Sequence, residues 1–144
     1  MIIKNKKIII LFLILIAAAI GVLMFGKQLT QLIKEKPPNA QFDSKEYDLG
    51  KIRKADGVVN KNFVITNIGG EKLIIGDITT SCGCTTAKID KKEILPGEKA
   101  NIMVNFDPNF HEEPKGRFSR SIYIPTNDPD NKEIELKIFT EIYE

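Results

Sequence analysis

The residues with the most distinctive chemistry are two cysteines separated by one glycine, in the run Ser81-Cys82-Gly83-Cys84-Thr85-Thr86. The chain of 144 residues has no other cysteine. Cysteine sulfur can form a disulfide, exchange with other thiols or bind a soft metal ion. Because the chain has one histidine and no tryptophan, few other side chains are available for catalysis. The sequence therefore directs the search for function to this loop.

Three interpretations of the cysteine pair are open. In the first, Cys82 and Cys84 form a structural disulfide, the usual state of paired thiols outside the cytoplasm. A ring closed over one residue removes little chain entropy, so it should stabilise the fold little, and Gly83 relieves part of its backbone strain. In the second, strain in this short ring eases its reduction, and the pair exchanges electrons with partner thiols. The Cys-x-x-Cys motif of the familiar oxidoreductases is absent.

In the third interpretation the two thiolates bind a soft metal ion, and Cu(I) is the ion that fits two sulfur ligands best. Zinc prefers four ligands, and only His111 and carboxylates remain to complete such a set. Met103 has outward parity on its strand and could offer a thioether. No glycine-rich phosphate loop, His-Glu-x-x-His or Gly-x-Ser-x-Gly motif is present. We therefore expect no catalytic residue and no cofactor, with Cu(I) as the alternative.

Two other polar groups have structural interpretations. His111 lies in a polar connection, residues 109–114, where a solvated loop residue is expected because the sequence offers it no catalytic partner. Asp128 and Asp130 resemble calcium ligands, but the spacing and the glycine of a calcium loop are absent. We expect them to form a turn.

The loop must be held by β-strands, because apolar residues alternate with polar ones over most of the chain beyond residue 41. The alternation is clear in 99–107, 117–125 and 133–143, and shorter around Phe63–Ile65 and Leu73–Ile75. Turn-forming Asn, Asp, Gly and Pro residues separate these segments. About seven short strands in about 100 residues are typical of an immunoglobulin-like β-sandwich, so we predict an all-β fold.

One residue breaks the strand pattern. Arg120 has the inward parity of Phe118 and Ile122, where an apolar side chain is expected. An edge position, a bulge or an acidic partner would each explain it, and the sequence does not choose among them.

The first 26 residues predict a membrane anchor. The run from Ile8 to Phe25 carries no charge and, as a helix, would be about 27 Å long, close to the hydrocarbon thickness of a bilayer. A cleaved signal peptide is the alternative, but its apolar region is usually only about 7–15 residues long. Lys4, Lys6 and Lys7 precede the run and should stay in the cytoplasm. The sequence thus predicts a single-pass protein of the bacterial inner membrane with a periplasmic domain.

The remaining chain divides into a predicted stalk linker, residues 27–40, and a folded domain, residues 41–144. Pro37 and Pro38 would end any helix in the stalk, because proline lacks the amide donor. The whole chain has a net charge of +2, and the part beyond the anchor is nearly neutral. Such a weak charge excludes a nucleic-acid partner bound through phosphate contacts.

Several motifs occur in an order that resembles a known family. They include the run 81–85, Asn67-Ile68-Gly69-Gly70, Pro96-Gly97, Gly116-Arg117-Phe118 and Thr126-Asn127. Together they resemble the bacterial domain-of-unknown-function family 1573 over nearly all of residues 41–144. The family is similar to immunoglobulin-like domains grouped with major sperm protein, and its members are usually exported or membrane-tethered. The resemblance implies a fold and an important cysteine loop, but no biochemical activity.

We therefore expect a non-enzymatic, membrane-anchored extracytoplasmic β-sandwich that serves as an interaction or scaffold module of the cell envelope. Its partner would be an unidentified envelope protein. Sandwich folds bind through end loops or edge strands. The predicted loop contacts are Gly83, Thr85, Phe110 and His111. The alternative function is a thiol-redox or Cu(I)-binding domain that uses Cys82 and Cys84.

Overall fold

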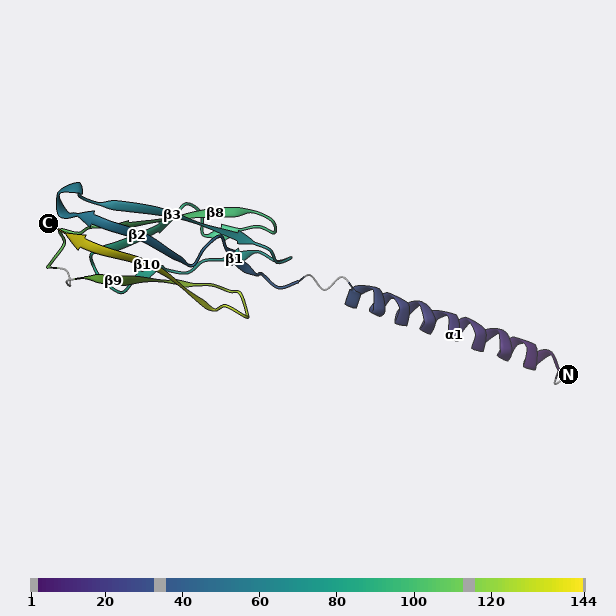
Figure 1. The fold of residues 1–144 in the computed structure, drawn as a ribbon. Helices are drawn as coiled ribbons and strands as arrows, with labels where there is room; N and C mark the ends of the chain where they lie inside the picture. The colour runs from purple at the N-terminus through teal and green to yellow at the C-terminus, as the bar shows by residue number, and fades with distance from the viewer. Residues whose placement is uncertain (1–2, 33–35, 113–115, 144) are drawn as a thin grey trace. The chain divides into compact units, whose positions relative to one another are not determined.

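The computed structural model describes residues 3–32, 36–112 and 116–143, which divide into a helical unit before residue 36 and a β unit from Lys36 onward (Figure 1). Helix α1, Ile3–Leu32, contains the predicted membrane segment. The side chains of Ile8 and Phe25 lie outside the described part, as does a portion of the predicted stalk. Among the residues described, no helix combines the length and the hydropathy that a membrane crossing requires. The membrane span therefore stays a prediction from the sequence.

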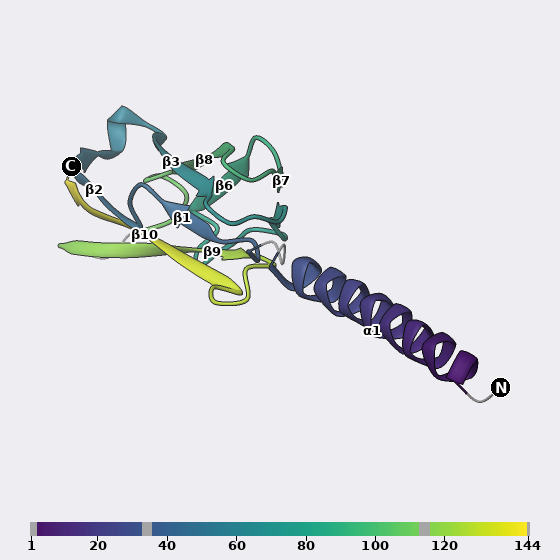
Figure 2. The same cartoon turned by 90° about the vertical axis from the view of Figure 1, so that its right-hand side faces the viewer.

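The β unit is a sandwich of two four-stranded sheets accompanied by a small two-stranded sheet (Figure 2). The first sheet has the order β1-β3-β8-β6, formed by Ala40–Phe42, Val59–Asn67, Lys99–Phe106 and Thr85–Ile89. The second has the order β2-β10-β9-β5, formed by Glu46–Arg53, Glu133–Tyr143, Arg117–Pro125 and Thr79–Thr80. The third pairs β4 with β7, which are Leu73–Ile74 and Glu93–Ile94. A 3-10 helix, Lys54–Asp56, follows β2.

The prediction of a mostly β fold is confirmed, and β9 and β10 have the predicted bounds. The described residues contain ten strands rather than about seven. Most of the additional strands are two to five residues long, and strands this short show too few alternations to be read from sequence. The longer exception, β2, pairs in parallel with β10 at a sheet edge, and most of its side chains are exposed. An edge strand with little burial has no period-two pattern.

The core lies between the two large sheets, because alternate side chains of the central strands point inward. In β8, every second residue from Ala100 to Phe106 is buried. Burial of one such large apolar side chain stabilises the fold by about 1.5–3 kcal/mol. The largest fully buried side chains of the four central strands are Phe63, Ile65, Ile102, Val104, Phe106, Ile122, Ile124, Leu136 and Ile138.

The chain enters the sandwich at the end opposite to the cysteine loop. At one end of β3, Asn67 pairs with Ala40, the first residue of β1. At the other end, Val59 pairs with Phe106, which also pairs with Thr85, the residue that follows the cysteines. A strand rises about 3.3 Å per residue, so the length of β3 separates the two ends.

Two buried polar side chains secure the point where the chain enters. The Asn67 side-chain amide donates to the carbonyl oxygens of Glu71 and Ile94, at 2.8 and 2.9 Å. The Asp128 carboxylate accepts the backbone N–H groups of Ala40 and Asp130, both at 2.9 Å. Asp128 thus ties β1 to the turn between β9 and β10, in agreement with the turn predicted for it.

Burial alone would raise the pKa of the Asp128 carboxyl, because it disfavours the charged form. Hydrogen bonds from the Ala40 N–H, the Asn131 side chain and the Asp130 N–H favour the carboxylate. Their combined effect outweighs the burial, and the pKa of Asp128 lies below its ordinary value. The ionised form is therefore the one that stabilises this end of the sandwich.

Candidate functional site

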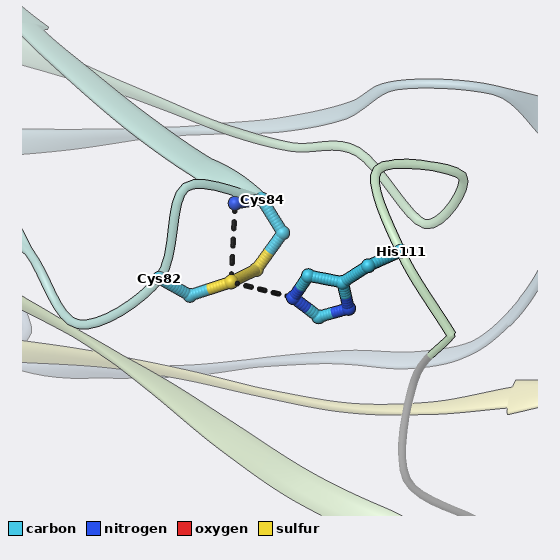
Figure 3. A group of neighbouring side chains, drawn as sticks. All are labelled: Cys82, Cys84 and His111. Carbon is cyan, nitrogen blue, oxygen red and sulfur yellow. Dashed lines mark hydrogen bonds between the residues drawn. A yellow bond between two sulfur atoms is a disulfide. The ribbon is translucent and has the colours of Figure 1, made fainter.

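Cys82 and Cys84 form a disulfide in the loop between β5 and β6 (Figure 3). The two sulfurs are not equivalent, because Cys82 is half-buried whereas Cys84 is only 2% exposed. The backbone N–H of Cys84 donates to the Sγ atom of Cys82 at 3.1 Å. An attacking thiol would therefore reach Cys82 more readily than Cys84.

The loop keeps its shape through hydrogen bonds to neighbouring backbone. The Thr80 hydroxyl contacts the carbonyl oxygens of Cys82 and Thr85, at 3.0 and 2.9 Å. The Thr85 N–H donates to the Cys82 carbonyl at 3.1 Å, which closes a turn over the cysteines. The Asp107 N–H donates to the Cys84 carbonyl at 2.8 Å. These contacts fix the disulfide at the ends of β6 and β8.

His111 approaches the disulfide from the segment after β8 (Figure 3). Its Nε2 atom lies 3.1 Å from the Sγ atom of Cys82, and its Nδ1 atom lies 3.2 Å from the carbonyl oxygen of Glu112. A carbonyl oxygen only accepts, so in the neutral ring the proton of this bond belongs to Nδ1. Nε2 then faces the sulfur as an acceptor.

Arg120 approaches the other sulfur from β9. Its Nε atom lies 3.2 Å from the Sγ atom of Cys84, and its guanidinium carbon lies 4.5 Å from the centre of the Phe118 ring. The inward parity noted in the sequence is thus explained, since the cation faces a sulfur and an aromatic ring. A guanidinium in this place stabilises a thiolate at Cys84.

The predicted loop contacts divide into exposed and buried residues. Gly83 and His111 are exposed, and so is Phe110, whose ring covers Gly83. Thr85 was predicted as a contact but is buried, because it begins β6 opposite Phe106. The connection after Phe110 was predicted to extend to residue 114, which lies outside the described residues.

The structure brings three of the candidate ligands together and leaves out a fourth. The Sγ atoms of Cys82 and Cys84 and a ring nitrogen of His111 lie within 4.8 Å of one another. Met103 is exposed and pairs with Lys88 within the β6–β8 ladder. The sequence does not predict that His111 lies beside the cysteines, because a residue in an irregular loop follows no helical or strand period that would indicate its position.

A shallow, mostly apolar pocket of about 270 Å³ lies beside the disulfide. Two apolar side chains at its rim, Val58 and Phe110, are 56% and 58% exposed. An exposed aromatic ring and an exposed branched side chain thus lie in the same pocket as Cys84, the buried half of the disulfide. The pocket is lined by Val58, Gly83, Cys84, Thr86, Asn105, Asp107 and Phe110.

The two-sheet sandwich places the domain in the immunoglobulin-like class, which includes the PapD-like domains, and solved structures support this. A protein of unknown function from Porphyromonas gingivalis W83 aligns with a TM-score of 0.65 and 26% identity, over 74% of this chain and 47% of that one. The YadV chaperone aligns with a TM-score of 0.51 and 12% identity, over 73% of this chain and 52% of the chaperone chain. A PapD-like domain of human CEP192 aligns with a TM-score of 0.52 and 5% identity, over 75% of this chain and 87% of that domain. The chain spans about half the length of the first of these proteins.

The sequence itself identifies the family. Residues 40–142 match the family described as "Protein of unknown function (DUF1573)", and the chain belongs to it. No curated protein matches the sequence significantly. The resemblance noted from the cysteine loop is thus confirmed.

Proposed function

We propose that the chain is a membrane-tethered module of the bacterial cell envelope that binds a protein partner through the end of the sandwich bearing the cysteine loop. The observation that carries this proposal is the exposed pair Phe110 and Val58 at the rim of the apolar pocket. Large apolar side chains beside a concave surface are typical anchors of protein interfaces. The site offers room for one apolar side chain of a partner.

The fold supports a binding role. Immunoglobulin-like sandwiches use loops at their ends for recognition. One protein of similar fold, YadV, is described as a chaperone, a class that binds other proteins. In the present chain the cysteine loop lies at the end opposite to Ala40, where the chain enters the domain. This arrangement keeps the loop away from the point of attachment.

The membrane tether and the location outside the cytoplasm are supported by the sequence. The uncharged run Ile8–Phe25 follows three lysines, which orient such segments with the N-terminus in the cytoplasm. We expect alkaline carbonate to leave the chain in the membrane fraction, and protease added to spheroplasts to remove the β unit. A carbonate-soluble chain would contradict the tether, and full protection from protease would contradict the location.

Binding can be tested by copurification from chemically crosslinked envelopes. The variant Phe110→Ser should lose the crosslinked partner that the wild-type chain retains. The matched control is Ile68→Ser, because Ile68 is also an exposed apolar residue but follows β3 at the opposite end of the sandwich. Equal recovery of the partner by both variants would contradict the proposed surface.

A second candidate function, thiol–disulfide exchange, is favoured by the groups on the two sulfurs. Nε2 of His111 faces Cys82 and Nε of Arg120 faces Cys84. Reduction of the disulfide creates two thiols that lose protons readily beside a base and a cation. Both groups therefore favour the reduced, reactive form of the pair.

The exchange can be written in two steps with a partner dithiol as the reductant. A partner thiolate attacks Sγ of Cys82, a bond forms between them, and Cys84 leaves as a thiolate beside Arg120. The second partner thiolate then attacks the partner sulfur of this mixed disulfide and releases the Cys82 thiolate. Two electrons have moved, so the partner becomes a disulfide, and the thiolates of Cys82 and Cys84 take two protons from the solvent to form the dithiol.

Equilibration of the full-length chain with dithiothreitol redox buffers tests this second candidate. Structural disulfides of secreted proteins have reduction potentials below about −300 mV. An exchange-active pair should instead be reduced reversibly at a potential above this value. A pair that stays oxidised down to more negative potentials would remove thiol exchange and leave the binding proposal intact.

A further inference from the structure

We propose that the reduced loop binds one Cu(I) ion through three ligands: the Sγ atoms of Cys82 and Cys84 and the Nε2 atom of His111. The inference rests on the dithiol form of the loop, which belongs to the second candidate function, and it adds a specific ligand. A dithiol must first reduce the disulfide and become a disulfide itself. Binding of the ion then displaces the two thiol protons.

The spacing of the donor atoms suits one metal ion. The three atoms lie within 4.8 Å of one another. With metal–sulfur bonds of about 2.3 Å, the ligands of a trigonal site lie about 4 Å apart. Once the sulfur–sulfur bond is broken, small rotations of the two cysteine side chains are enough to reach this spacing, since Cys82 Sγ and His111 Nε2 are already 3.1 Å apart.

The orientation of His111 is that of a metal ligand. Its Nδ1 atom is hydrogen-bonded to the Glu112 carbonyl, so the proton of the neutral ring is on the side away from the cysteines. Histidines that bind metals usually donate this second N–H to a carbonyl or a carboxylate, which fixes the ring and its tautomer. The contact with Glu112 thus points the Nε2 lone pair at the sulfurs.

The number and type of ligands select Cu(I) over zinc. Among the described residues, no further His, Cys, Asp or Glu completes the cluster of three. Structural zinc prefers four protein ligands, whereas soft thiolates favour Cu(I) at low coordination number. The guanidinium of Arg120, 3.2 Å from Cys84 Sγ, offsets part of the negative charge that two thiolates bring to one ion.

Cu(I) titration against a competing chromophoric chelator tests the site, with the full-length chain reduced and kept anaerobic in detergent. We expect one Cu(I) per chain, and His111→Ala should weaken its affinity at least about tenfold. The matched control is Met103→Ala, which removes an exposed thioether outside the cluster and should leave the affinity unchanged.

X-ray absorption at the copper edge distinguishes the ligand sets. The wild-type chain should show two sulfur neighbours and one nitrogen neighbour, and His111→Ala should lose the nitrogen. An unchanged affinity in His111→Ala, a spectrum with sulfur neighbours alone in the wild type, or tighter binding of Zn²⁺ than of Cu(I) would each overturn the inference. Loss of partner binding in the crosslinking test bears on the proposed function and leaves these metal measurements unaffected.

Discussion

The Nε atom of Arg120 lies 3.2 Å from the Sγ atom of Cys84, so a cation on the inward side of β9 faces the buried half of the disulfide. This contact joins β9 to the loop that leads from β5, the neighbour of β9 in the second sheet, to β6 in the first. A positive charge next to a sulfur stabilises the thiolate that reduction produces. Arg120 therefore favours the reduced loop.

Replacement of Arg120 by methionine should make the reduction potential more negative, because the thiolate of Cys84 loses its cation. We expect a shift of about 30 mV, which corresponds to a tenfold change in the equilibrium with a dithiol. Redox titration of the chain measures it. The control is Arg117→Met on the same strand, since Arg117 pairs with Asp48. Equal potentials for wild type and Arg120→Met would show that the contact has no effect on the redox equilibrium.

Replacement of both cysteines by alanine should leave a folded domain. The disulfide closes a ring with one residue between the cysteines, so the chain-entropy gain is only about 2 kcal/mol. Denaturant unfolding followed by tyrosine fluorescence measures the free energy of unfolding. The loss of a cooperative transition in this variant would instead make the disulfide essential for folding.

Two glycines should respond differently to alanine. A Cβ at Gly69 would lie 2.2 Å from the Pro37 carbonyl oxygen and 2.6 Å from the Asn39 nitrogen, both fixed backbone atoms. Gly69→Ala should therefore destabilise the fold by about 2 kcal/mol or more. A Cβ at Gly83 would meet only the edge of the exposed Phe110 ring, which can rotate away. Comparable losses in the two variants would contradict this distinction.

Asp128 should make stability depend on acid pH. Because its folded-state pKa is lowered, the carboxylate contributes stability above the unfolded value near pH 4, and this is lost as the pH falls through the folded value. Asp128→Asn should destabilise the chain by about 1–3 kcal/mol at neutral pH, and the difference should shrink in acid. The matched control is Asp77→Asn, because Asp77 is an exposed aspartate whose carboxylate pairs with Lys92. A difference between wild type and Asp128→Asn that is constant with pH would contradict the role of ionisation.

The strands that could be predicted are those with one face in the core. β8, β9 and β10 each bury alternate residues, so their sequences show the two-residue period. β2 has no such face, because it lies at an edge with most of its side chains exposed. Its parallel pairing with β10 depends on contacts distant in sequence and leaves no local signal.

The candidate site could be predicted only in part, for the same reason. The Cys-Gly-Cys spacing drew attention to the loop, and the inward parity of Arg120 drew attention to a charged residue in an apolar strand pattern. Neither showed that Arg120 contacts Cys84, since the two lie 36 residues apart in the sequence and meet only through the pairing of β5 with β9. His111 was predicted as a loop contact, but nothing in the sequence placed it beside Cys82. Thr85 was predicted as a loop contact too, although its side chain is buried opposite Phe106.

The most direct test of the binding surface is photocrosslinking in intact cells, with a photoreactive amino acid at position 110 or at position 68. Both positions carry exposed apolar residues, 58% and 53% exposed, at opposite ends of the sandwich. We predict a discrete adduct from position 110 that Val58→Ser weakens, and none from position 68. Adducts from position 68 alone, or of equal yield from both positions, would contradict a functional surface at the cysteine loop.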